Sequence, residues 1–418
     1  MNIGKYRQVI ENFFSLSVLN AVNIVLQLVT LPYILGVVGK ANYGIYAYVF
    51  MVIQYIILFS TYGFNYSATK QISQLRDDNA AVTRIYNAVI GCKTLIALVL
   101  VVAVVACSRW GFEESIGFEM FLLGTGMILG DIMNPVWLFQ GMEKMKYMTL
   151  VNSTSKILFT VLVFFVVRSV DDFYLLILLN SCGYLLAGIL SLVLARKQFK
   201  VRIAMPRVRD MIAQFKDGGA MFGSTFGMNL YRNAHVLILK HLASNEAVGL
   251  FSAAEKVIHG FQSVILPAAQ ALFPHVSLRF KGRSVKENVA LMKKVMLPFV
   301  GFAFFAALFV YIFAPWISDV LCGAEFRECV PLIRIMSLVI IFGEVNYIAG
   351  IVGLVNMDRQ NYFFRSVLIT GVCSCLITLA LVKGYGAYAG AVSLSASEAL
   401  LMGMCLYGLF SNRKTDLK

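Results

Sequence analysis

The sequence lacks most of what an enzyme of its size would carry. Charged residues make up only 14% of its 418 positions, histidine occurs four times and proline eight times. It contains no Walker loop, and the run Gly124, Gly126 and Gly130 has the wrong final spacing for a dinucleotide loop. Its eight cysteines fit no metal or redox spacing, although Cys322 and Cys329 share one predicted outside loop and could pair. We therefore expect no enzymatic activity, no cofactor and no metal site.

Apolar residues are present in excess and account for 59% of the chain. A soluble domain of this length does not need so many, so the composition indicates a membrane protein. Apolar stretches of about 20 residues, long enough to cross roughly 30 Å of hydrocarbon as helices, recur along the chain. Strand-like alternation is absent, so we predict an all-α membrane protein with about twelve transmembrane helices. We place these spans near residues 13–36, 44–66, 84–107, 117–139, 148–168, 173–195, 218–240, 247–272, 289–314, 331–354, 362–383 and 387–410.

The positions of lysine and arginine predict how the chain crosses the membrane. Basic residues concentrate at one set of span ends, above all in residues 196–216 and 279–294. Because positive charge near span ends stays in the cytoplasm, both termini are expected there. The formal net charge of +14 is then largely a topology signal, and no nucleic-acid partner is needed to explain it.

A basic interruption divides the predicted spans into two sets of six. We therefore predict an N-terminal lobe over residues 1–195, a basic cytoplasmic linker over 196–216 and a C-terminal lobe over 217–418. Tyr43-Gly44-Ile45-Tyr46 opens the second span and Val248-Gly249-Leu250-Phe251 opens the eighth, which favours a duplicated unit over a chance recurrence. An even number of spans in each half predicts parallel repeats, which bind a substrate between them and alternate by rocking.

Four basic residues lie within apolar spans, where a charge at the helix centre costs roughly 2.5 to 3.5 kcal/mol. They are Lys93, Lys156, Arg232 and Lys256. Together they predict a cationic lumen that attracts an anion, and the arginine fork matches the geometry of phosphate. The alternative for Arg232 is snorkelling to the outer interface, because it lies past the midpoint of its span.

Uncharged polar residues mark two of the spans. Asn20, Asn23 and Gln27 are spaced three and four apart, so they share one face of the first helix. Asn229 and Asn233 lie in the seventh span. Such side chains either line a polar cavity or join helices through hydrogen bonds worth about 0.6 kcal/mol each, and the sequence leaves both open.

The remaining ionisable residues within the apolar spans are candidates for ion coupling. Glu255 and His259 are four apart and stack on one face of the eighth span, so they could exchange protons across the physiological range. His235, Asp131 and Glu344 are further candidates within apolar spans. The alternative for Glu255 is a structural ion pair with Lys256 or Arg232, and the lone charges could likewise be paired structurally.

Four local patterns are shared with one known family. They are Leu31-Pro32-Tyr33 with Tyr43-Gly44-Ile45-Tyr46, Gly63-Phe64-Asn65-Tyr66-Ser67-Ala68-Thr69-Lys70, Pro135-Val136-Trp137-Leu138-Phe139-Gln140-Gly141-Met142-Glu143, and Gly249-Leu250-Phe251-Ser252-Ala253-Ala254-Glu255-Lys256. The chain resembles the bacterial O-antigen and polysaccharide flippases of the Wzx type, a branch of the multidrug/oligosaccharidyl-lipid/polysaccharide exporter superfamily. The resemblance covers essentially the whole chain, and the second and third patterns are the most specific. At His235 the chain departs from its relatives, which often carry an acidic residue there, so an ion role at this position is in doubt.

The resemblance implies a V-shaped, two-lobed bundle in the bacterial cytoplasmic (inner) membrane. It would move an undecaprenyl-pyrophosphate-linked oligosaccharide between the leaflets, coupled to a gradient of H⁺ or Na⁺, with a polysaccharide polymerase as a possible further partner. Arg232, Lys256 and Lys156 would hold the pyrophosphate. Asn20, Asn23 and Gln27 would bind sugar hydroxyls. The alternatives are a drug or cation antiporter of the same superfamily, which would favour an acidic, aromatic lumen, and a polysaccharide polymerase, which would need a large outside loop that the sequence does not show.

Overall fold

The computed structural model describes residues 3–107, 115–280, 285–323, 326–357 and 359–411. Within these residues every regular element is a helix and no strand forms, which confirms the all-α class. The chain divides into two compact units, Met1–Leu26 with Ile45–Phe226, and Gln27–Gly44 with Gly227–Lys418. Part of the first long helix therefore packs with the C-terminal half of the chain.

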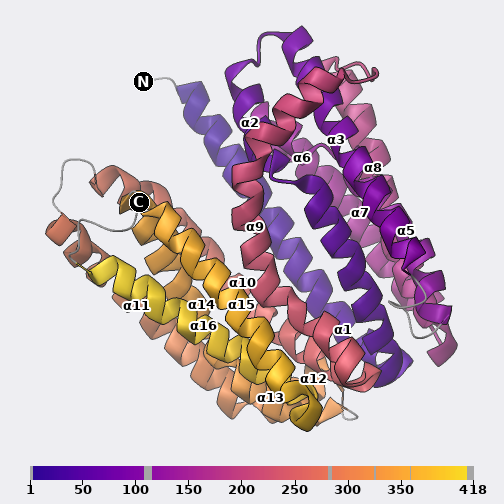
Figure 1. The fold of residues 1–418 in the computed structure, drawn as a ribbon, viewed down its shortest axis with the longest axis vertical. Coiled ribbons are helices and arrows are strands. Elements are labelled where there is room, and N and C mark those ends of the chain that lie inside the picture. The colour runs from indigo at the N-terminus through magenta and orange to yellow at the C-terminus, as the bar shows by residue number, and fades with distance from the viewer. Residues whose placement is uncertain (1–2, 108–114, 281–284, 324–325, 358, 412–418) are drawn as a thin grey trace. The chain divides into compact units, whose positions relative to one another are not determined.

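The first unit contains two segments of α1, the helices that follow it and the start of α9. These elements are α1 (Ile3–Thr61), α2 (Phe64–Gln74), α3 (Asn79–Ala106), α5 (Ser115–Met133), α6 (Val136–Gly141), α7 (Met145–Val166), η1 (Val170–Asp172), α8 (Phe173–Phe199) and α9 (Val208–Leu242). α5 and α8 lie side by side (Figure 1). A Cβ at Gly130 would fall 2.3 Å from the backbone of Tyr184, so only glycine allows this approach.

A break between α5 and α6 shapes the interior of the first unit. Pro135 has no N–H and cannot continue α5, so the chain leaves the helix at Asn134. Trp137 and Phe139, both fully buried, then anchor α6 in an apolar core that also includes Phe199. The break leaves the Asn134 side chain available to α7, where its Nδ2 donates to Asn152 Oδ1 at 2.9 Å.

The segment between α8 and α9 is short and held in place. Residues 200–207 are not helical, whereas the flanking parts of the predicted basic linker are continuous with α8 and α9. Asn87 of α3 donates to the Arg202 carbonyl and accepts from the Ala204 amide, each at 2.9 Å. One buried amide thus fixes this connection to the first unit.

The second unit contains the remaining helices and a π-helical stretch. These elements are α10 (Asn245–Phe280), α11 (Val285–Ile312), α12 (Ala314–Leu321), α13 (Cys329–Met336), α14 (Leu338–Asn346), η3 (Tyr347–Leu354), η4 (Val355–Met357), α15 (Gln360–Tyr385) and α16 (Ala387–Phe410). η3 is the π-helical stretch, and in it Gly350 lies against the Phe363 ring, where a Cβ would come within 2.3 Å of Cε2. Widened turns of this kind are frequent at functional sites. Cys322 and Cys329 are both buried free thiols.

Buried hydroxyls line the contact between α15 and α16, which lie side by side (Figure 1). They are Ser366, Thr370, Ser374, Thr378, Ser393 and Ser397, all at 0% exposure. Several return a hydrogen bond to the carbonyl four residues earlier, as Thr378 does to Ser374 at 2.9 Å. Small polar residues allow close helix packing where no water is available.

The outer surface fits a lipid environment. Nine helical segments of the described residues are long and apolar enough to cross a membrane, and the first of them, Val18–Gln74, covers two of the predicted spans. α9 and α10 are not among the nine, so the count of twelve stays a prediction. Large apolar side chains remain exposed in rows, as on α3 and α11: Leu95, Leu98, Val99, Val102, Val105, Phe304, Phe305 and Phe309. Water would disfavour such patches, whereas hydrocarbon accepts them.

Candidate functional site

Polar cavities occur inside both units, and each contains residues that the sequence singles out. In the second unit a cavity of about 210 Å³ is lined by side chains from α9, α10, α14, η3, α15 and α16. In the first unit a chamber of about 450 Å³ is lined by side chains from α1, α5, α7 and α8, with two residues of the α5 to α6 junction. Both volumes suit small polar groups of a ligand.

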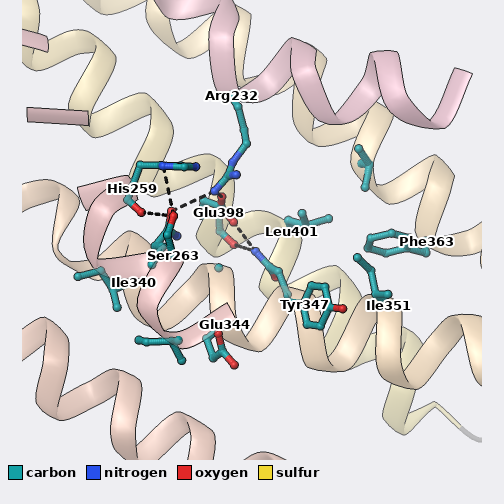
Figure 2. A pocket seen from close by; sticks show the side chains of 15 residues that line it. Arg232, His259, Ser263, Ile340, Glu344, Tyr347, Ile351, Phe363, Glu398 and Leu401 are labelled. Carbon is teal, nitrogen blue, oxygen red and sulfur yellow. Dashed lines mark hydrogen bonds and ion pairs between the residues drawn. The ribbon is translucent and has the colours of Figure 1, made fainter. Parts of the chain in front are cut away.

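Arg232 is the cation of the second-unit cavity. It donates to Gln262 Oε1 of α10 at 3.1 Å, and its guanidinium lies 3.7 Å from Glu398 Oε1 of α16. Figure 2 shows Arg232 extending from α9 toward Glu398. The Arg232 side chain is 39% exposed, whereas that of Glu398 is 1% exposed. A buried carboxylate therefore anchors an arginine that a ligand can still reach.

The carboxylates of this cavity sit beside the π-helical stretch. Asn346, the last residue of α14, donates to Glu398 Oε2 at 2.6 Å and to the Glu398 carbonyl at 3.0 Å. Glu344 also borders the cavity and is 5% exposed, and its Oε1 has no hydrogen-bond partner among the described residues. A buried carboxylate oxygen without a partner is costly, so a proton or a cation at Glu344 would be stabilised.

Glu255 and His259 share a second cavity with Arg232. This cavity measures about 200 Å³, and Asn229 and Asn233 also line it. Asn233 Nδ2 donates to Asn229 Oδ1 at 3.1 Å. The i, i+4 spacing of Glu255 and His259 thus places both on the cavity wall, on the same helix as Gln262.

His235 and Lys256 lie outside both cavities. His235 is 1% exposed, and its ring nitrogens lie 2.9 Å from Thr378 Oγ1 and 3.3 Å from Ser374 Oγ. Lys256 Nζ lies 5.1 Å from the centroid of the Tyr43 ring, a cation–π contact. His235 and Arg232 are three residues apart on α9, yet the structure gives them different neighbours.

Lys93 and Asp131 form a buried ion pair in the first unit. Lys93 Nζ donates to Asp131 Oδ2 at 2.7 Å and to the Asp131 carbonyl at 2.9 Å. The Lys93 side chain is 3% exposed and that of Asp131 is 23% exposed. The charge of Lys93 is thus compensated inside the unit, and Asp131 alone of the two lines the chamber.

Lys156 is the basic residue on the chamber wall, and its Nζ donates to Asn23 Oδ1 at 2.8 Å. Asn20 is exposed on α1, and Gln27 belongs to the other unit. The three amides predicted to form one face of the first helix are therefore divided between the units.

Several cavity residues were not candidates from the sequence. They are Gln262, Asn346 and Glu398 in the second unit, and Asn152, Asn180 and Tyr184 in the first. Glu398 stands out in the sequence only as a lone charge in the last span. The amides carry no charge and follow no repeated spacing, so nothing in the sequence marks them.

Helices long and apolar enough to span a membrane, with polar side chains lining cavities in their interior, define a multi-pass membrane protein. Residues 9–278 match the model of the family described as "Polysaccharide biosynthesis protein", and the chain belongs to this family.

Two curated relatives cover nearly the whole chain, and each is named "Putative O-antigen transporter". The protein from Escherichia coli (strain K12) is 28% identical over 96% of this chain and 97% of its own length. The protein from Shigella dysenteriae is 22% identical over 94% of this chain and 98% of its own length. Both relatives are named as transporters, in agreement with the expectation that the protein is not an enzyme.

Solved structures share the fold. The inward closed conformation of the lipid II flippase MurJ superposes with a TM-score of 0.76 at 12% identity, covering 97% of this chain and 88% of that one. The inward-facing conformation of a multidrug resistance MATE family transporter of the MOP superfamily gives a TM-score of 0.69 at 13% identity, covering 94% and 93%. At such identities the likeness establishes the fold alone. The predicted helical fold is therefore confirmed, while the count of twelve helices and the division into two six-helix lobes stay predictions.

Proposed function

We propose that the protein is a flippase for an undecaprenyl-pyrophosphate-linked oligosaccharide, the repeat unit of O-antigen or a related surface polysaccharide. It acts in the bacterial cytoplasmic membrane, with both termini in the cytoplasm, and exposes its polar cavities alternately to the two sides. The family and the two named relatives support this proposal over a drug antiporter and over a polymerase. A polymerase that consumes the translocated unit is the expected protein partner.

The proposal rests on Arg232, whose side chain is 39% exposed and is held in place by the buried carboxylate of Glu398. A pyrophosphate cannot cross hydrocarbon unaided, because an unpaired charge there costs several kcal/mol or more. Arginine keeps its charge and offers a planar fork of donors that matches phosphate oxygens. With Glu398 and Gln262 fixing its orientation, Arg232 presents this fork to the cavity.

Ion coupling follows from competition for Arg232. In the absence of substrate, Glu398 compensates the arginine charge at 3.7 Å. When the pyrophosphate replaces Glu398 as the ionic partner of Arg232, the carboxylates of Glu398 and Glu344 need another positive charge. H⁺ or Na⁺ supplies it. Binding of the ion and of the pyrophosphate would then favour each other, because coupling between two sites is reciprocal. Glu255 and His259, on the second cavity around Arg232, are the further proton-exchanging groups.

Transport by the purified protein tests the proposal. The protein is reconstituted into vesicles that contain a fluorescent undecaprenyl-pyrophosphate oligosaccharide, and a membrane-impermeant quencher reports the outer leaflet. We expect the protein to speed equilibration between leaflets and a pH or Na⁺ gradient to change the rate. Equilibration no faster than in protein-free vesicles, with protein that remains folded, would exclude the flippase. A flipping rate that does not change with the pH or the Na⁺ gradient would exclude ion coupling but not the flippase function.

A further inference from the structure

The chamber inside the first unit, at about 450 Å³, is more than twice the volume of either cavity at Arg232, and the pyrophosphate site does not account for it. Its wall is rich in amides, with Asn23, Asn134, Asn152 and Asn180 all facing it, and Phe159 adds an aromatic surface. Its volume of about 450 Å³ lies in the usual range for small-molecule sites, roughly 300–1,000 Å³. Amides that both donate and accept suit a hydroxyl-rich ligand.

The amides are held in fixed orientations by the protein. Asn152 donates to the Met148 carbonyl at 2.9 Å and accepts from Asn134 at 2.9 Å, while Asn134 accepts from Ser191 Oγ at 3.0 Å. Asn180 donates to the Leu176 carbonyl at 2.8 Å. Preorganised polar groups lose little freedom when a ligand binds, which favours recognition of a specific arrangement of hydroxyls.

One hydroxyl on the wall has no partner among the residues that the structure describes. Ser155 is 1% exposed and lines the chamber, yet its Oγ makes no hydrogen bond to any described residue. A buried hydroxyl left without a partner destabilises the protein, so a ligand oxygen that forms a hydrogen bond with Ser155 binds more tightly for it.

The charge of the chamber identifies the ligand further. Among the described residues Lys156 donates to Asn23 alone and forms no ion pair. Asp131 is the carboxylate on the wall, and it is already paired with Lys93 at 2.7 Å. Among the described residues, the chamber therefore carries one net positive charge that no protein group compensates. A ligand with a single negative charge fits this balance, whereas a pyrophosphate carries more charge than one lysine can offset and would meet Asp131.

We propose that this chamber binds one sugar ring that carries a carboxylate, a uronic-acid type residue, with Lys156 on the carboxylate and Ser155 and the amides on the hydroxyls. The proposal rests on the flippase function and deepens it. The first unit then recognises which sugars the substrate contains, whereas Arg232 in the second unit binds its phosphates. A transporter built this way prefers repeat units that contain an acidic sugar.

Binding of simple sugars tests the chamber apart from transport. Saturation-transfer difference NMR on the full-length purified protein uses sodium glucuronate, glucose and inorganic pyrophosphate as probes. We expect glucuronate to bind at least about tenfold more tightly than glucose, and Lys156→Gln to abolish that preference. Lys146→Gln, on the same helix but outside the chamber, is the matched control and should bind as the unchanged protein does.

A second variant removes the risk that Lys156→Gln misfolds. Ser155→Ala deletes an oxygen with no partner among the described residues, so the fold should be kept while glucuronate binds about three- to tenfold more weakly. Equal binding of glucuronate and glucose, or unchanged glucuronate binding in Lys156→Gln, would overturn the proposal. The proposal would also be overturned if pyrophosphate displaced bound glucuronate at a lower concentration than galacturonate does. If transport occurs without glucuronate binding, the chamber proposal fails and the flippase stands; if glucuronate binds but no lipid-linked oligosaccharide moves, the flippase fails.

Discussion

Gly44 and Gly249 pack backbone against backbone in a reciprocal contact. A Cβ on Gly44 would lie 1.8 Å from the Asn245 carbonyl oxygen, and a Cβ on Gly249 would lie 2.2 Å from the Lys40 carbonyl oxygen. Each carbonyl belongs to the residue four positions before the opposite glycine. The two sequence motifs that echo one another thus meet in a nearly symmetric arrangement, as expected for segments that descend from one duplicated unit.

Alanine at either glycine should therefore destabilise the protein. The added methyl has no room beside a backbone carbonyl, and overpacking of this kind typically costs about 1–3 kcal/mol. We expect Gly44→Ala and Gly249→Ala to lower the Tm and the yield of monodisperse protein in detergent. Gly36→Ala, in the part of α1 that precedes the break at Gly39, is the control, because its Cβ would meet nothing within 4 Å. Equal Tm values for all three variants would contradict this packing.

The buried pair Lys93 and Asp131 should show strong coupling in a double-mutant cycle. Removal of one partner leaves an uncompensated buried charge, which costs about 3–5 kcal/mol. We expect Lys93→Met and Asp131→Leu each to lower thermal stability more than the combined variant does. Stability changes that simply add would show that the 2.7 Å contact contributes no interaction energy.

The ion pair between Lys40 and Glu328 is a surface interaction of small effect. It measures 2.8 Å, but the Glu328 side chain is 63% exposed, so Glu328→Ala should cost less than about 1 kcal/mol. The hydrogen bond to Glu328 raises the pKa of Lys40 above its ordinary value of 10.5. A raised folded-state pKa means that the contribution is complete below the unfolded pKa and is lost as pH rises through the folded one. Thermal unfolding from about pH 9 to about pH 12 should therefore bring the Tm values of the unchanged protein and Glu328→Ala together. A difference that stays constant would refute the assignment.

Glu398 should govern the response to the ion gradient. Glu398→Gln keeps the shape and the Asn346 contact but cannot take up H⁺ or compensate Arg232 as a charge. We expect reconstituted Glu398→Gln protein to flip lipid-linked oligosaccharide at a rate that no longer depends on the gradient. Glu246→Gln, an exposed carboxylate in the first turn of α10, is the control. Full gradient dependence in Glu398→Gln would remove this residue from the coupling scheme.

The fold was predictable from hydropathy because the bilayer leaves few choices for the backbone. Apolar length and absent alternation require helices, and all regular elements of the described residues are helices. The position of Arg232 on a polar cavity also follows from the cost of a charge in hydrocarbon.

What the sequence could not give is which distant side chain compensates each charge. Three residues along a helix turn the side-chain direction by about 300°, so Arg232 and His235 diverge by about 60° and contact different helices. The hydroxyls around His235 come from α15, and Glu398 comes from α16. These partners lie more than a hundred residues away, and only the packing of the unit brings them together.

If Arg232 binds the pyrophosphate, its replacement by alanine should slow flipping of the lipid-linked oligosaccharide in vesicles. Loss of charge-assisted hydrogen bonds worth about 1.5–3 kcal/mol predicts a rate roughly 10- to 150-fold lower at limiting substrate. Arg232→Lys should recover only part of it, since lysine lacks the fork. Arg334→Ala, which removes an arginine over the Tyr311 ring, should keep the full rate. A folded Arg232→Ala protein that flips the lipid-linked oligosaccharide as fast as the unchanged protein would show that Arg232 does not bind the pyrophosphate.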